Sequence, residues 1–342
     1  MGTVGAILIA SLVFLTMTTA GRASDKSSKD AAARPQALAL FQKALAVSNI
    51  RAPGSPPFEL RGTILVHGVG KEDASGTYLL KWATPDRWRE EIHFPNYFRI
   101  RVGGKDEYFQ SRSIPYEVVP VYDLSAALDF LKELHFWAKE SSIADRQKIK
   151  THQRKVGRVK ADCVTLLRKK DDAYGPEFCF DLDKGLLLRS ENNEFSGFAS
   201  VGGKLFPSVV LVKGASPTTV ELKLSTLASL ESVTDADFQP APDATTWASC
   251  DDPDQLALLS HSAIPNYPVG ARLAHVQGIV VAYGIVGADG RLHGLKTLNN
   301  PNSDLTQSAL TVLNQWEYGP EFCHGKPVST EVVIRVVFNI GD

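Results

Sequence analysis

The sequence has almost no excess of charge of either sign. It carries 37 Lys and Arg residues against 38 Asp and Glu residues in a chain of 342 residues. A protein that attracts nucleic acid or anionic lipid through its overall field needs a clear basic excess, so we expect no nucleic-acid partner. The one local concentration of basic residues runs from Arg146 to Lys160. It lacks interleaved aromatic residues, and we interpret it as a solvated helix end or a hairpin.

The sequence also lacks recognisable catalytic signatures. Its eight His residues are scattered, none of them in an HExxH pattern, and no GxSxG motif occurs. The carboxylate pairs Asp171-Asp172 and Asp251-Asp252 lie in turn-like segments, where we expect them to be solvated. Cys323-His324 are sequence neighbours, which rarely point together as a nucleophile and its base. We therefore expect no enzyme activity, no catalytic residue and no cofactor.

The longest apolar run lies at the N-terminus. Val4–Thr19 is apolar or small, and the polar stretch AGRASDKSSKD follows it. This pattern is typical of a secretory signal peptide cleaved after Ala20 or Ala23. The run is also long enough to span a bilayer, so an uncleaved inner-membrane anchor is the alternative. We assign residues 1–23 to the signal peptide or anchor and expect a periplasmic location.

Export makes the few cysteines interpretable as disulfides, since such proteins mature in an oxidising compartment. Cys163 and Cys179 lie at equal distances on either side of Asp171, within a stretch of hairpin-turn chemistry. Two strands closing around that turn would place them opposite each other. Cys250 and Cys323 then form the second pair by elimination, although four cysteines allow three pairings. A zinc site is disfavoured because no CxxC or CxH pair occurs, and we expect no metal site.

Residues 31–244 have the pattern of a strand-rich domain. Apolar residues at helical spacing predict a first helix over Pro35–Ile50 and a second over Leu124–Glu140, with Asp123 as its N-cap. Short alternating runs separated by Gly, Pro and Asn predict strands before and after the second helix. The fold class is therefore α+β, with an antiparallel sheet.

This domain resembles the LolA-like and LppX-like periplasmic lipoprotein carriers. The resemblance lies in the opening helix and in the segments GTYLLKWATPDRWREEI, RIRVGGKDEYFQ and FCFDLDKGLLLRSE. It implies a curved, half-barrel-like sheet with helices on its concave face and an apolar cavity for a lipid or other apolar ligand. The alternative is that the aromatic residues simply fill a core. These residues are Trp82, Trp88, Phe94, Tyr97 and Phe98.

A Pro-rich and acidic stretch, residues 245–263, is interpreted as a linker to a second domain at residues 264–342. The second domain begins with a short helix, followed by strands over Gly278–Val286 and Leu292–Asn299. A helix with Ser303 as its cap and a long β-branched final strand complete the order α-β-β-α-β.

The second domain closely resembles the C-terminal domain of TonB-family proteins, over about residues 264–340. The shared residues follow the family's order and spacing. They are Tyr267, Pro268, Gly278, Asp289, Gly290, Trp316, Pro320, Gly325 and Pro327. The resemblance implies an envelope protein partner, recognised as an extended peptide that adds to a sheet edge by β-augmentation.

We expect the final strand to be that peptide-binding edge, with Glu331 and Arg335 guarding it against indiscriminate pairing. Its residues are Glu331, Val332, Val333, Ile334, Arg335, Val336, Val337 and Phe338. Cover by the first domain, or by a second copy of the chain in a homodimer, is the alternative. The sequence thus predicts an exported envelope binding protein, with a structural scaffold and a TonB-like energy transducer for outer-membrane transport as alternatives. The transducer is disfavoured because the N-terminal segment contains no His.

Overall fold

The computed structural model describes residues 20–68, 73–104, 106–169, 174–213, 218–248 and 253–340. The apolar run Val4–Thr19, both Asp-Asp pairs and Cys250 lie outside the described residues. Within the described part of the chain, no helix is long and apolar enough to cross a membrane.

An open antiparallel sheet forms the first domain, as the sequence predicts. Over the described residues it has 13 strands, in the order β15-β5-β4-β3-β2-β1-β14-β13-β10-β9-β8-β7-β6. The sheet is not closed into a barrel, because β15 and β6 at its two ends do not pair with each other. The strands are β1 (Phe58–His67), β2 (Ala74–Thr84), β3 (Arg87–Phe94), β4 (Tyr97–Gly104), β5 (Glu107–Arg112), β6 (Lys148–Val156), β7 (Val159–Leu167), β8 (Glu177–Asp181), β9 (Leu187–Ser190), β10 (Asn193–Ser196), β13 (Val209–Lys213), β14 (Thr219–Ser229) and β15 (Thr245–Ala248).

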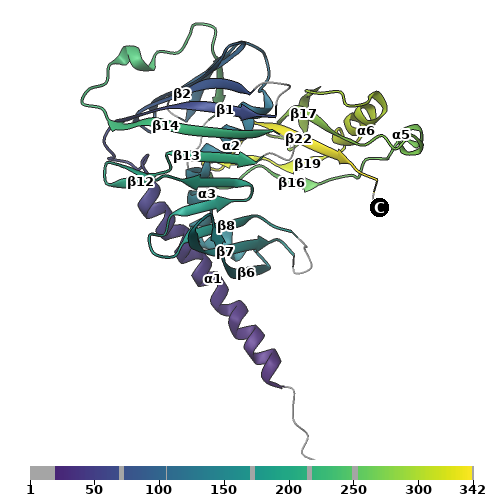
Figure 1. Ribbon diagram of the computed structural model, residues 1–342, viewed down its shortest axis with the longest axis horizontal. Coiled ribbons are helices and arrows are strands. Elements are labelled where there is room, and N and C mark those ends of the chain that lie inside the picture. Colours follow the sequence, from purple (N-terminus) through teal and green to yellow (C-terminus); the bar gives the residue numbers. More distant parts are fainter. Residues whose placement is uncertain are drawn as a thin grey trace, which may run out of the picture.

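Helices cover one face of this sheet (Figure 1). They are α1 (Ala20–Ser48), α2 (Val119–Leu128), α3 (Phe130–Trp137) and α4 (Glu140–Ala144). A small hairpin of β11 (Ala199–Val201) and β12 (Lys204–Phe206) and a short 3-10 helix, η1 (Asp235–Phe238), complete the domain. Helix α1 begins upstream of the predicted start and continues through Pro35, although Pro has no N–H for the helical ladder and its ring crowds the carbonyl four residues earlier.

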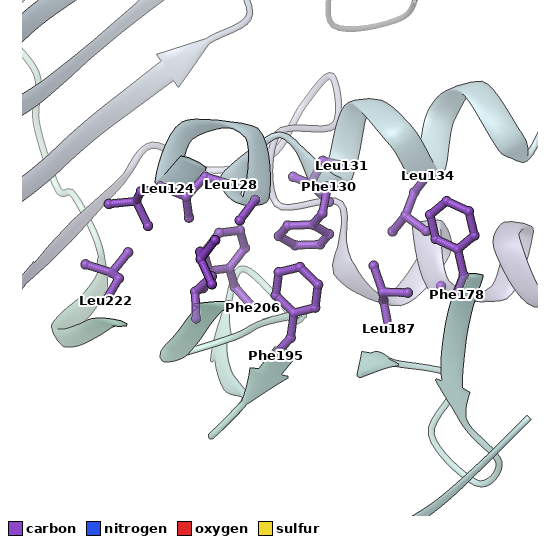
Figure 2. Packing of buried hydrophobic residues seen from close by; sticks show 14 of the residues in the cluster. Leu124, Leu128, Phe130, Leu131, Leu134, Phe178, Leu187, Phe195, Phe206 and Leu222 are labelled. Carbon is purple, nitrogen blue, oxygen red and sulfur yellow. The ribbon is translucent and has the colours of Figure 1, made fainter. Parts of the chain in front are cut away.

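The layer between helices and sheet is filled by large side chains. Figure 2 shows Leu124, Leu128, Phe130 and Leu134 of α2 and α3 directed at apolar residues of the strands. From α1, the Phe41 ring meets those of Phe178 and Phe180 edge-on, with centroids 5.0 and 5.1 Å apart. Of the aromatic residues predicted to fill a core, Trp82 and Tyr97 are buried, Trp88 and Phe94 are half-buried, and Phe98 is exposed.

The prediction of Asp123 as an N-cap is wrong. Helix α2 begins at Val119, with a Pro in its first turn, so Asp123 lies inside the helix. The single helix expected up to Glu140 is also interrupted at Asp129, where the backbone leaves helical geometry (φ −76°, ψ 13°) and α3 begins. Asp disfavours helix interiors because its side chain competes for backbone hydrogen bonds.

The C-terminal domain has the predicted order α-β-β-α-β. A three-stranded sheet, in the order β18-β17-β22, packs against α6. Short strands lie at its margins: β16 pairs with β19, and β20 with β21. The elements are β16 (Leu258–His261), α5 (Val269–Leu273), β17 (Gly278–Val286), β18 (Leu292–Thr297), α6 (Ser303–Leu313), β19 (Glu317–Gly319), β20 (Glu321–Cys323), β21 (Lys326–Val328) and β22 (Thr330–Phe338).

The predicted cap of α6 is displaced by one residue. The Asn302 side chain, rather than that of Ser303, accepts hydrogen bonds from the Asp304 and Leu305 backbone amides. Asn is at least as good an N-cap as Ser, because its carbonyl oxygen reaches the same orphan N–H groups.

Candidate functional site

The predicted peptide-binding strand, β22, lies at an edge of the C-terminal sheet. It pairs antiparallel with β17 along its whole length, from Gly278↔Phe338 to Val286↔Thr330. Within the described residues, no other strand pairs with β22. A strand with one paired edge keeps a second row of backbone groups, which is the chemistry that β-augmentation uses.

The two faces of β22 have different environments. Val332, Ile334, Val336 and Phe338 belong to the core that packs on α6. The alternate residues Glu331, Val333, Arg335 and Val337 lie on the opposite face, because strand side chains alternate. That second face is directed at the first domain, which lies beside β17 and β22 (Figure 1).

Glu331 anchors this face to the first domain. Its Oε1 accepts from Arg112 Nη1 at 2.7 Å, and the Tyr283 hydroxyl donates to the same oxygen. Arg101 lies 3.8 Å from Oε2. The side chains of Arg112 and Glu331 are only 11% and 6% exposed. Burial alone would lower the pKa of Arg112, but the Glu331 carboxylate outweighs it and the pKa is raised. The carboxylate therefore stabilises a buried cation of the other domain.

Arg335 makes a second anchor, to Asp123 of α2. Its Nη2 donates to both carboxylate oxygens, at 2.7 and 2.6 Å. Burial raises the pKa of Asp123, and the Arg335 guanidinium opposes that rise. Burial likewise raises the pKa of the Tyr122 phenol, and a hydrogen bond from the Val333 backbone opposes it.

A third group of contacts lies beside β20. Lys132 Nζ of α3 donates to Glu321 Oε1 at 2.5 Å. Lys139 Nζ donates to the Pro253 carbonyl at 2.8 Å, and Arg168 Nη1 donates to that of Leu259 at 3.1 Å. The predicted linker takes part in both domains, because β15 pairs with β5 and β16 pairs with β19. The structure therefore shows the two domains in extensive polar contact.

Several TonB-motif residues hold loops in place. The Tyr267 hydroxyl donates to the Val276 carbonyl at 2.5 Å, and Trp316 Nε1 donates to that of Ala263 at 3.0 Å. Gly290 has φ +74°, a conformation that favours glycine, and its carbonyl accepts from Tyr318 N at 2.8 Å.

The remaining motif residues also lie at turns and strand ends. The Asp289 carboxylate accepts from the Arg291 amide at 3.0 Å. Gly325 has φ +74° and its amide donates to Asp254 Oδ2 at 2.7 Å. Gly278 starts β17, the Pro320 carbonyl accepts from Gln255, and Pro327 lies in β21. The motif thus builds the scaffold, whereas β22 supplies the candidate binding edge.

Two cavities stand out, and neither is an apolar chamber inside the curved sheet. One, of about 40 Å³, is lined by polar groups that include Arg51, Asp129 and Lys132. The other, of about 450 Å³, lies between α6 and residues 263–268 of the C-terminal domain. The first has room for a few waters rather than an acyl chain.

The first predicted disulfide is confirmed. Cys163 and Cys179 are opposite each other on β7 and β8 and are bonded, with their Cα atoms 4.0 Å apart. Cys323 is 7% exposed. Its predicted bond to Cys250 stays a prediction, because Cys250 is not among the described residues. In the described part of the chain, no group of His, Cys, Asp or Glu residues is arranged to hold a metal ion.

The sequence analysis did not predict a buried charge cluster in the first domain, formed by side chains of β3, β4 and the segment before α2. Arg99, with a side chain 1% exposed, donates to Glu117 at 2.6 Å and to Glu90 at 2.7 Å. These carboxylates outweigh burial, which alone would lower the pKa of Arg99, and the pKa is raised. The sequence predicts strands at both positions but not their register, and the pairing of β4 with β3 brings Arg99 near Glu90.

The C-terminal part of the chain matches a known protein family. Residues 263–340 match the family model of the Gram-negative bacterial TonB protein C-terminal domain, which confirms the predicted resemblance. The chain is 31% identical over 88 residues to the protein TonB of Vibrio cholerae. That match covers 25% of this chain and 36% of the relative, so the chain spans about a third of that protein's length.

Solved structures with a similar chain path are distant. One is a putative outer membrane lipoprotein-sorting protein domain from Vibrio parahaemolyticus, with 13% identity and a TM-score of 0.34 over 60% of this chain and 97% of that one. Another is a LolA superfamily protein from Nitrosomonas europaea, with 10% identity and a TM-score of 0.32 over 59% and 97%. Both TM-scores lie below 0.5, so these likenesses assign no function to the chain.

Proposed function

We propose that this protein is an exported binding protein of the cell envelope, whose C-terminal domain engages an envelope protein by adding an extended segment to β22. The observation that supports this function is the family match over residues 263–340 together with the edge position of β22. Main-chain hydrogen bonds would supply affinity, and the alternating side chains of the added strand would supply selectivity.

The partner would enter at the C-terminal end of β22. Helix α2 packs against the strand, and its Asp123 carboxylate accepts from Arg335. Val337, two residues further on, is 59% exposed. Entry at that end leaves the two anchors, Glu331 and Arg335, in place during the first contacts.

A photo-crosslinking residue at Val337 tests the proposal in cells of a Gram-negative host. Val269 on α5 is the matched control, because it is an equally exposed valine (63%) of the same domain that lies outside β22. We expect one envelope protein to be captured from Val337 and not from Val269. Equal capture at both positions, or none at Val337, would contradict strand addition at this edge.

The covered face of the sheet in the first domain favours the structural scaffold over a lipid carrier. Its sheet is covered by α1, α2 and α3, whose side chains interdigitate with those of the strands (Figure 2). Native mass spectrometry of the protein purified from the periplasm tests this point. A lipid released on denaturation would support the lipid-carrier hypothesis. A protein mass without bound lipid, after incubation with envelope lipids, would support the structural scaffold.

A further inference from the structure

The strand β6 forms one end of the large sheet and has a free edge. It pairs antiparallel with β7 along all nine of its residues. Within the described residues, no other strand pairs with it. Every residue from Lys150 to Lys155 is exposed, so this part of the strand is open to solvent. Its unpaired row of backbone groups is a template to which another strand can add.

The register of the sheet identifies the backbone groups at the free edge. The Leu166 amide donates to the Pro176 carbonyl, so the backbone of Leu166 is directed at β8. Alternate residues of an antiparallel ladder bond opposite neighbours, so the backbone of Thr165 is directed at its partner in β6, Lys150. Thr151, the next residue of β6, therefore directs its N–H and C=O groups away from β7.

Cations line one face of β6. Ile149 belongs to the buried core of the first domain, and the side chains of a strand alternate between its two faces. The opposite face therefore carries the cation row, which consists of Lys148, Lys150, His152 and Arg154. Within the described part of the chain, Lys148 and Lys150 form neither an ion pair nor a side-chain hydrogen bond.

Little negative charge compensates the cation row. Among the described residues, Glu177 of β8 is the one carboxylate that forms an ion pair with a side chain of β6. It lies 3.3 Å from His152 and 3.2 Å from Arg154. Arg189 of β9 lies 3.8 Å from the same carboxylate. The 15 residues from Arg146 to Lys160 contain no Asp or Glu. The row therefore keeps a net positive charge.

Protection against aggregation is a general reason for cations on an edge strand. Like charges directly opposite each other on paired strands are destabilising, so the cation row disfavours pairing of β6 with β6 of a second copy. It does not repel a strand of opposite charge. Carboxylates opposite the row would add favourable cross-strand pairs to the main-chain hydrogen bonds. The charge that prevents indiscriminate pairing therefore selects an acidic strand.

We propose that β6 binds an extended acidic segment of another protein, which adds to the large sheet as a further strand. The backbone of the segment would bond the free groups of Thr151 and its alternate neighbours. Carboxylates at every second position of the segment would face the cation row. Main-chain bonds would supply affinity and the carboxylates would supply selectivity. This edge lies in a different domain from β22, so the two edges can be occupied independently.

Two fluorescein-labelled peptides of identical composition separate strand addition from simple attraction of charge. In the first peptide Glu occupies every second position, with Val and Thr between, so that an extended strand presents all its carboxylates on one face. The second peptide contains the same residues with all its Glu together, which divides them between the two faces. Fluorescence anisotropy with the full chain measures both affinities. We expect the alternating peptide to bind on the order of 10-fold more tightly, and less tightly as salt rises.

Two double variants of equal charge locate the site within the hairpin. Each opposite-charge pair across a strand contributes up to about five-fold in affinity. Lys148→Gln with Lys150→Gln should therefore weaken binding of the alternating peptide on the order of 10-fold. Arg158→Gln with Lys160→Gln is the matched control, because both residues are exposed, lie at the tip of the same hairpin and are outside β6. This control should titrate close to the parent.

Thr151→Pro tests the backbone edge without changing any charge. Proline is tolerated in an edge strand where the N–H faces solvent, but it removes the donor that an added strand would use. We expect this variant to lose peptide binding while it keeps the melting temperature of the parent. Where the melting temperature falls, the two double variants, which leave the backbone unchanged, decide the question.

The proposal is overturned if both peptides bind equally or if neither binds. Equal effects of the two double variants would also overturn it, because they would show a general attraction of anions to the hairpin. Binding at the affinity of the parent by a folded Thr151→Pro variant would exclude strand addition at this edge. None of these outcomes bears on β22.

Discussion

Replacement of Glu331 by Gln should destabilise the protein by about 3 kcal/mol. The substitution keeps the size of the side chain but removes the charge that Arg112 meets at 2.7 Å. Both side chains are nearly inaccessible to water, so the cation would remain buried without a counter-charge. Breaking one partner of a buried ion pair costs about 3–5 kcal/mol. The Gln carbonyl still accepts one hydrogen bond, which places the expected loss at the lower end.

Glu317→Gln is the matched control. Glu317 also pairs with an arginine of its own domain, Arg291, at 3.0 Å, but the two side chains are 48% and 59% exposed. Exposed pairs contribute about 0–1 kcal/mol. Urea unfolding followed by circular dichroism gives both free energies of unfolding. Equal losses for the two variants would refute the argument that Glu331 stabilises the contact between the domains.

Three further predictions concern the remaining fold. Burial raises the pKa of Glu133 to about 7, from 4.5; the native state then holds a proton that the unfolded chain releases, so the free energy of unfolding should fall by about 3 kcal/mol between pH 4.5 and 7. Glu133→Gln should abolish that fall in urea titrations, while exposed Glu231→Gln should keep it. Replacing Cys163 and Cys179 by Ala opens a loop with a sequence separation of 16 and should cost about 3 kcal/mol, measured by thermal unfolding; no loss would contradict a structural role. Gly290→Ala should cost about 2 kcal/mol, because φ is +74° and a Cβ would lie 2.3 Å from a backbone carbonyl oxygen; an unchanged melting temperature would show that the turn can relax.

Much of the C-terminal domain could be predicted, because its signals are local. Alternation and β-branching predicted a strand over Gly278–Val286, and the structure has the same bounds. Helical spacing predicts Leu305, Ala309, Val312, Leu313 and Trp316 on one helical face. The first four are buried in α6, but Trp316 lies beyond the helix end at Leu313 and is half-buried. The errors fall at helix ends, where neighbouring polar residues compete. Asn302 and Ser303 can both cap a helix, and the sequence does not say which of them leaves helical geometry first.

The contact between the domains could not be predicted in the same way. Glu331 and Arg335 alternate with apolar residues, as solvated charges of an edge strand do, and the sequence suggested that role. Their partners Arg112 and Asp123 are more than 200 residues away in the chain. Ion pairs over such separations depend on how the two sheets dock, and no period or motif records that. The alternative of a covered edge was foreseeable, but the residues that cover it were not.

The anchors have a consequence for partner binding at β22. A strand added along the whole edge must move α2, which contacts β22, so β22 can bind along its whole length only when the two domains separate. The apparent dissociation constant rises by the inverse of the competent fraction. If the anchors favour the docked state by about 3 kcal/mol, that fraction is roughly 1 in 150, and affinity falls by the same factor. Glu331→Gln should therefore weaken folding and tighten partner binding together. A partner that binds both forms equally would instead have to use only the exposed end of the strand, near Val337.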